Sequence, residues 1–326
     1  MNHHKKNILS RAGGKFLYLV LFFLLFLMLL FPKTAARGAL DGLLLWSKTL
    51  LPILLPFLIL SGLILTLHMT RPFELLLSPI FTHIFPISSA ACYPLLIGLL
   101  CGMPLGAKTA ATLYLAGRIN KRDAMFLLCF SNQASMMFLV SYVATRELNV
   151  PYCAVFVLII LYSSALLSTA IFILPRHRKE KSANVYAFTA RHTTSRTNAS
   201  TPSFFSALDT SITESFATIT KVGGYVILFS MLSAFAGNLP LPAPLTAFVS
   251  GLLEITSGIQ KIADTFPPAQ KTALTLAVTA FGGFSGLMQT KSVTLGTGLS
   301  MRRYAFVKLM QGIFAYLLTL LLLSFI

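Results

Sequence analysis

Charged side chains are scarce in this sequence. Only 11% of the 326 residues are Asp, Glu, Lys or Arg, whereas a soluble domain carries about 25%. Such a chain cannot cover a globule with solvated side chains. Its hydrophobic content of 56% instead supplies many apolar segments, and a helix that spans a bilayer needs about 20 such residues. We therefore expect an all-α, polytopic transmembrane helical bundle.

Cysteine, histidine and catalytic motifs are equally sparse. The four cysteines lie in or beside apolar segments without a CxxC pair, which favours small buried hydrophobes over a disulfide or a metal site. No histidine lies inside a clear span, and the sequence has no P-loop, GxSxG or HExxH motif and no pair of membrane carboxylates. We expect no enzymatic activity, no metal and no cofactor, although H⁺ or Na⁺ could act as a coupling ion.

Acidic residues are few, since 9 Asp and Glu stand against 26 Lys and Arg, for a net charge of +17. The basic residues cluster at the amino end and in the polar stretch after Pro175. Basic clusters beside hydrophobic spans orient a membrane protein by the positive-inside rule and contact anionic lipid headgroups. We expect the lipid bilayer as a partner and no nucleic acid, and a homo-oligomer remains open.

Hydrophobicity divides the chain into four parts. Residues 1–39 form the cytoplasmic amino end and a first helix, expected to be an uncleaved signal anchor rather than a removable signal peptide. Residues 40–175 and 204–326 form two membrane halves, separated by a basic polar linker at 176–203 that cannot bury apolar area. Whether 75–87 and 245–262 span the membrane or turn back as hairpins stays open.

The two halves show signs of an internal repeat. Shifting the second half by 181 residues aligns Gly102 with Gly283 and Thr109 with Thr290. With the amino end and the linker in the cytoplasm, the halves have opposite orientations. Inverted repeats around broken helices are typical of secondary transporters. Inversion also places Arg302 and Arg303 outside, which the positive-inside rule disfavours.

A helix break is predicted where Gly102, Pro104 and Gly106 follow one another at every second position of an apolar segment. Broken backbone at membrane depth is tolerated where it lines a polar cavity or is buried in protein. The freed amides and the start of the next half-helix, with Lys108, would form a seat for an anion. The alternatives are a kinked helix, or a re-entrant loop that leaves Lys108 near the surface.

Three further polar positions interrupt apolar segments. Ser131, Asn132 and Gln133 would line the cavity, or instead join helices by hydrogen bonds. Glu254, near Gly258, would couple or gate transport, or instead form an ion pair with Lys108. At the second glycine-rich break, Gly282 and Gly283 would permit gating while Ser285 and Gln289 supply neutral donors; close helix packing is the alternative.

Several of these motifs together resemble the sporulation integral membrane proteins of the YlbJ family, within the nucleoside-recognition or Gate-domain superfamily. The matching pieces are Leu40-Asp41-Gly42-Leu43-Leu44-Leu45-Trp46, Leu51-Pro52, Leu55-Pro56-Phe57, 101–108, Phe130-Ser131-Asn132, 251–254 with Gly258, and 281–285 with Gln289. The superfamily is also similar to concentrative nucleoside transporters. This chain departs from nucleoside carriers because it has one membrane glutamate rather than several acids.

The resemblance implies a role in endospore formation, in the cell membrane or the mother-cell-derived membrane around the forespore. The expected function is secondary transport of a small organic anion, with dipicolinic acid as the cargo that the family implies. Lys108 and the amides at 102–106 would bind one carboxylate, while Ser131, Asn132, Ser285 and Gln289 would orient the ring and the second carboxylate. The alternatives are a nucleoside-type solute carrier and a non-transporting scaffold for sporulation proteins.

Overall fold

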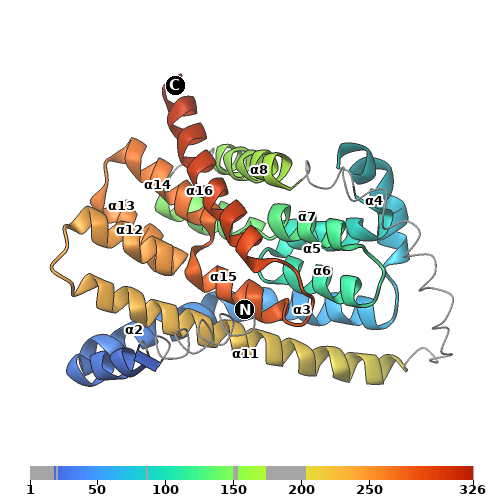
Figure 1. The fold of residues 1–326 in the computed structure, drawn as a ribbon, viewed down its shortest axis with the longest axis horizontal. Helices are drawn as coiled ribbons and strands as arrows, with labels where there is room; N and C mark the ends of the chain where they lie inside the picture. The colour runs from blue at the N-terminus through green and yellow to red at the C-terminus, as the bar shows by residue number, and fades with distance from the viewer. Residues whose placement is uncertain (1–17, 20, 86, 150–152, 174–202, 326) are drawn as a thin grey trace, which may run out of the picture.

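The computed structural model describes residues 18–19, 21–85, 87–149, 153–173 and 203–325, and these residues form helices without any strand (Figure 1). The predicted all-α, polytopic class is confirmed. The basic amino end and the 176–203 linker, apart from Ser203, lie outside the described residues, as does the side chain of Cys153. The part of the first helix that is described runs from Leu21 to Leu30.

Four described helices are long and apolar enough to cross a membrane. The first is a continuous helix over Pro32–Thr66, made of α2 (Pro32–Leu45), a π-helical stretch (Trp46–Leu50) and α3 (Leu51–Thr66). It starts before residue 40, where the first membrane half was expected to begin, with a proline in its first turn, where the missing N–H breaks no helical bond. The others are α8 (Cys153–Phe172), α11 (Phe204–Gly237) and α16 (Met301–Leu323).

These long helices expose large hydrophobic side chains on their outer faces, including Leu43, Phe57, Ile159, Leu228 and Leu317. A soluble monomer rarely exposes so much contiguous apolar surface. The exposure fits helices whose outer faces contact lipid rather than water. Figure 1 shows α11 as a long rod along one edge of the molecule with α2 beside it, and α16 crossing the opposite part near α8 and α14.

Two pairs of short helices fold back on themselves. One hairpin consists of α5 (Cys92–Cys101) and α6 (Leu105–Leu115), and the other of α12 (Ala243–Leu253) and α13 (Ile255–Thr265). Their arms cross at glycines: a Cβ on Gly106 would lie 2.7 Å from the Cα of Gly98, and one on Gly258 would collide with the Cα of Gly251. The segment 245–262 is therefore a hairpin rather than a span.

Two further helices are interrupted. Helix α7 (Lys121–Phe130) ends at Ser131, and a π-helix continues over Phe138–Glu147. Helix α14 (Pro268–Phe281) ends where Gly282 and Gly283 take φ values of +84° and +66°, before α15 (Gly283–Val293). Positive φ is nearly free for glycine and costly for other residues. The segment 75–87 contributes α4 (Arg71–Ile84), which is bent by 103° relative to the next helical segment, Ser89–Cys101.

The order of elements corrects the repeat register. Each half contains a long span, a hairpin, an interrupted helix and a final span. The hairpin crossing at Gly98 corresponds to the crossing at Gly251, and the end of α7 at Phe130 corresponds to the end of α14 at Phe281. The 181-residue shift instead aligned a hairpin tip, Gly102, with a residue of an interrupted helix, Gly283, so that register is wrong. Glycines coincided at that shift because a hairpin tip and an interrupted helix each require glycine, although for different reasons.

Candidate transport site

The tips of the two hairpins meet the two interrupted helices at one place. The side chain of Met103, at the first tip, packs on Gly282 and Gly286, where an added Cβ would lie 3.1 Å and 2.8 Å from its atoms. The second tip reaches Gly283, whose Cβ would lie 3.3 Å from the Leu253 carbonyl oxygen. We call the region formed by 102–104, 131–135, 253–256 and 282–286 the central junction.

A cavity of about 60 Å³ lies at the central junction. Its polar lining comes from residues far apart in the sequence, namely Ser135, Glu254, Thr256, Ser285 and Gln289. Its apolar lining includes Leu50, Leu54, Cys101, Met103, Phe138 and Val226. Typical small-molecule pockets have about 300–1,000 Å³, so this cavity is smaller than such pockets.

Glu254 is the acidic side chain of this cavity. It is 4% exposed and forms the N-cap of α13, where its Oε2 accepts a hydrogen bond of 2.8 Å from the Ser257 amide. A carboxylate is well placed there because the first turn of a helix carries unpaired N–H groups and a partial positive charge. Glu254 has no ion pair with Lys108, so the alternative based on that pair is wrong.

Four of the predicted site residues are brought together in this cavity. Gly282, Ser285 and Gln289 line it together with Glu254, and the Gln289 Nε2 donates to the Ser285 Oγ at 3.0 Å. Gly258 and Gly283 lie just behind it, at the arm crossing and against the second tip. These positions belong to the second half of the chain, so the cavity's polar side is built mostly by the start of α13 and by α15.

The backbone amides at Gly102–Gly106, which were expected to bind an anion, instead donate hydrogen bonds within the protein. The Gly102 amide donates to Gly98, that of Gly106 to Gly102, and that of Lys108 to Pro104. The Met103 amide donates to the Gln133 carbonyl oxygen at 2.6 Å, and the Ala107 amide to the Asn132 Oδ1 at 3.3 Å. The amides of residues 102, 103 and 106–108 therefore already have acceptors within the protein in this conformation. Pro104 forms the N-cap of α6 rather than part of a ligand cradle.

Lys108 lies on the outer side of the first hairpin and does not line the cavity. Its Nζ donates to the Thr218 Oγ1 at 3.0 Å and lies 4.0 Å from the Glu214 carboxylate. The lysine side chain is 24% exposed and the glutamate 66%. In this conformation the arm of α6 directs the Lys108 side chain towards α11, so the structure does not bring it together with the predicted site residues that line the cavity.

Ser131, Asn132 and Gln133 are buried and hold the helices together. The Asn132 Nδ2 donates to the Thr290 Oγ1 at 2.9 Å and to the Tyr304 hydroxyl at 2.8 Å, while its Oδ1 accepts the Ala107 amide. Ser131 donates to the Leu127 carbonyl oxygen. Asn132 thus joins the first hairpin, α7, α15 and α16. Hydrogen bonding between helices, rather than cavity lining, is what this geometry supports.

Gln133 leads to a chain of side chains that the sequence analysis missed. Its Oε1 accepts a 2.8 Å bond from the Lys308 Nζ, and its Nε2 donates to the Gln311 Oε1 at 3.0 Å. The Gln311 Nε2 in turn donates to the Cys129 carbonyl oxygen at 2.6 Å. Tyr304, Lys308 and Gln311 are four and three residues apart, which places them on one face of α16. That spacing within an apolar helix was the signal available in the sequence.

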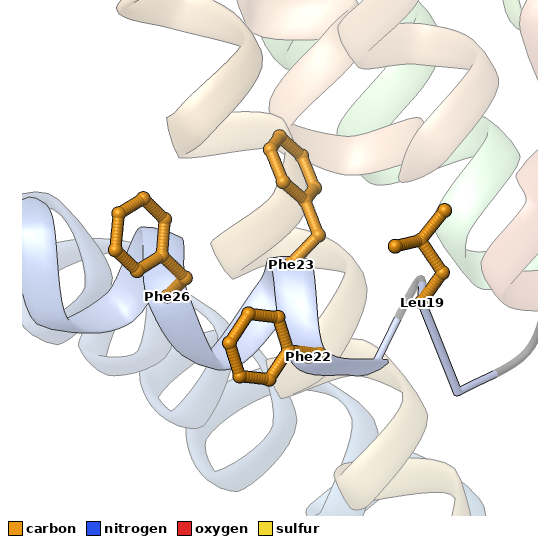
Figure 2. A pocket seen from close by; sticks show the side chains of 4 residues that line it. All are labelled: Leu19, Phe22, Phe23 and Phe26. Atoms are coloured by element: carbon orange, nitrogen blue, oxygen red, sulfur yellow. The ribbon is translucent and has the colours of Figure 1, made fainter.

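A second hollow has a different character. It measures about 400 Å³ and is lined by Leu19, Phe22, Phe23 and Phe26 of the amino-terminal helix (Figure 2). Its lining is apolar, so it offers no polar group that could orient a charged or hydrogen-bonding cargo. Phe22 and Phe23 are themselves exposed, and a lipid chain is the natural neighbour for such a surface. Within the described residues, no group of three or more His, Cys, Asp and Glu is arranged to hold a metal.

Comparison with known proteins adds one relative. The chain is 27% identical to the sporulation integral membrane protein YlbJ of Bacillus subtilis, over an alignment of 325 residues that covers 89% of this chain and 78% of the relative. No protein-family model matches the chain, and no solved structure matches it. The similarity supports the YlbJ family that the motifs indicated, and several apolar helices agree with a multi-pass integral membrane protein.

Proposed function

We propose that this chain, a relative of the sporulation integral membrane protein YlbJ, is a secondary transporter of a small organic anion. The observation that carries the proposal is the convergence of two hairpin tips and two interrupted helices around one cavity with polar lining. Interrupted helices in transporters place irregular backbone beside the substrate, where rocking or tip movement opens one side at a time. Dipicolinic acid is the proposed cargo, during endospore formation, on the strength of the family resemblance.

Glu254 gives the proposal its coupling step. An ionised carboxylate that lines the cavity repels an anionic cargo, and it is costly inside a membrane protein unless a cation compensates it. Binding of H⁺ or Na⁺ at Glu254 removes this repulsion, so cargo and coupling ion enter together. Ser257 holds the carboxylate at the tip of the second hairpin, which makes the tip itself sensitive to the ion.

The glycine contacts of the two hairpins bear on which parts of the protein move. The first tip packs by the flexible side chain of Met103 against Gly282 and Gly286, and no side chain on either glycine obstructs it. The arms of each hairpin cross closely at glycines, whereas the first tip contacts α15 through a single flexible side chain, that of Met103. We propose that the tips move as units and enlarge the cavity to accept the cargo.

Uptake by proteoliposomes tests the function. Purified protein should accumulate labelled dipicolinate in response to a proton or sodium gradient, and should not accumulate labelled uridine or Fe²⁺. Gln289→Leu, which removes an amide from the cavity, should lower this uptake, while Gln260→Leu on the exposed face of α13 serves as the matched control. Uptake of uridine in place of dipicolinate would favour a nucleoside-type carrier, and absence of uptake of any solute would favour a scaffold.

A further inference from the structure

The structure contains a buried lysine that the proposed function has not used. Lys308, in the middle of α16, is 0% exposed, although lysine is almost never fully buried without a partner of opposite charge. Among the residues that the structure describes, no Asp or Glu forms an ion pair with it. Its Nζ has one side-chain acceptor, the Gln133 Oε1 at 2.8 Å, while an ammonium group can donate three hydrogen bonds.

The surroundings of Lys308 solvate a positive charge without cancelling it. In the chain from Lys308 through Gln133 and Gln311 to the Cys129 carbonyl, each amide presents its oxygen towards the lysine and its NH₂ group away from it. Dipoles aligned in one direction reinforce one another and favour a cation at the oxygen end. All groups in this chain are neutral, so none of them supplies a negative charge to pair with Lys308.

The lysine stands directly behind the cavity wall. An added Cβ on Gly282, which lines the cavity, would lie 3.5 Å from the Lys308 Cε. Gly282 has φ +84° and must be glycine to keep this conformation without strain. The Met103 Cε would lie 3.1 Å from the same added Cβ, so the first hairpin tip also packs at this point. Glu254 and Gln289, which line the cavity together with Gly282, come from other elements than Lys308.

We propose that Lys308 is the residue that binds the anionic group of the cargo, its ammonium being held by Gln133 when the cavity is empty. The proposal rests on the proposed function and names the group that selects for negative charge. Lys308 thus takes the role of binding the carboxylate, which the sequence analysis expected of Lys108. With Lys308 behind Gly282 and the Glu254 carboxylate in the cavity itself, the site offers one group for a carboxylate and another for H⁺ or Na⁺.

Two substitutions remove the free positive charge in opposite ways. Lys308→Gln deletes it, and Gln133→Glu neutralises it by placing a carboxylate of nearly the same shape against the Nζ. The second variant forms a buried ion pair and does not depend on tolerance of a missing lysine. Lys291→Gln, at an exposed lysine in the last turn of α15, is the matched control.

Equilibrium binding of labelled dipicolinate and of its neutral analogue pyridine-2,6-dicarboxamide to purified protein provides the readout. Both Lys308→Gln and Gln133→Glu should weaken dipicolinate binding by about 10- to 100-fold, the effect of a hydrogen bond to a charged group. Binding of the neutral diamide should change less than about twofold, because only charge recognition is lost. Lys291→Gln should behave as the wild type towards both compounds.

The outcomes separate the two proposals. A wild-type protein that binds dipicolinate, with Gln133→Glu folded and within twofold of wild type, overturns the role of Lys308 and leaves the transport function standing. Equal weakening of dipicolinate and diamide binding also overturns it, since that would show a merely structural role. A wild-type protein that binds uridine and neither pyridine compound refutes the proposed function itself.

Discussion

Replacing Gly258 by alanine tests the hairpin that carries Glu254. A Cβ at this position would collide with the Cα and N of Gly251 in the opposite arm, and these are backbone atoms that no rotamer change can move. Overpacking costs about 1–3 kcal/mol, and contact with backbone places this case at the upper end. The gain of about 1 kcal/mol for Gly→Ala in a helix offsets part of it. The free energy of unfolding should fall by about 2 kcal/mol.

Gly224 offers a matched control for this substitution. It lies within α11, and a Cβ there would have no heavy atom within 4 Å. Gly224→Ala should therefore have only the favourable effect of alanine's higher helix propensity and stabilise the protein by about 0.5–1 kcal/mol. Both variants can be compared by denaturant-induced unfolding of purified protein in detergent, followed by circular dichroism. Equal stability of the two variants would refute the idea that crossed glycines hold the hairpin closed.

Three further substitutions probe other parts of the site. Asn132→Ala should destabilise the protein by about 2–4 kcal/mol in the same assay because it leaves several buried polar groups unpaired, whereas Asn238→Ala, at an exposed hydrogen bond, should cost under about 1 kcal/mol. Glu254→Gln keeps an oxygen for the Ser257 amide, so exchange of dipicolinate across proteoliposomes should persist while gradient-driven accumulation stops; accumulation at the wild-type level would contradict ion coupling. Lys108→Gln should change the free energy of unfolding by less than about 1 kcal/mol, since its carboxylate partner is exposed; a larger loss would mean that this ion pair anchors the first hairpin.

The positions of the helix breaks were predictable from the sequence, and their shapes were not. Proline and paired glycines interrupt helices by local backbone chemistry, which is why the breaks near Pro104 and Gly282 were expected. Whether the chain then reverses depends on tertiary contact. Gly98 and Gly106 bring two arms together, while nothing comparable joins α14 to α15. A pattern of residues along one segment does not contain that difference.

The residues of the candidate site were likewise only partly predictable from the sequence. Glu254 was identifiable because a lone acid in an apolar segment is costly unless it has a task. The amides near Gly102 were expected to be free, but two of them donate to Gln133 and Asn132, which come from a segment about 30 residues further along the chain. Lys308 was missed because its partner Gln133 belongs to the other half of the chain. Only the fold brings these residues together.

The most direct test of the transport mechanism is to lock the first hairpin tip. In protein freed of its native cysteines, Met103→Cys combined with Gly286→Cys places two thiols where the tip packs against α15. Oxidative cross-linking should stop dipicolinate uptake by proteoliposomes, and a reductant should restore it. Uptake that continues at the same rate in fully cross-linked protein would contradict the claim that cargo passes through the central junction by movement of this tip.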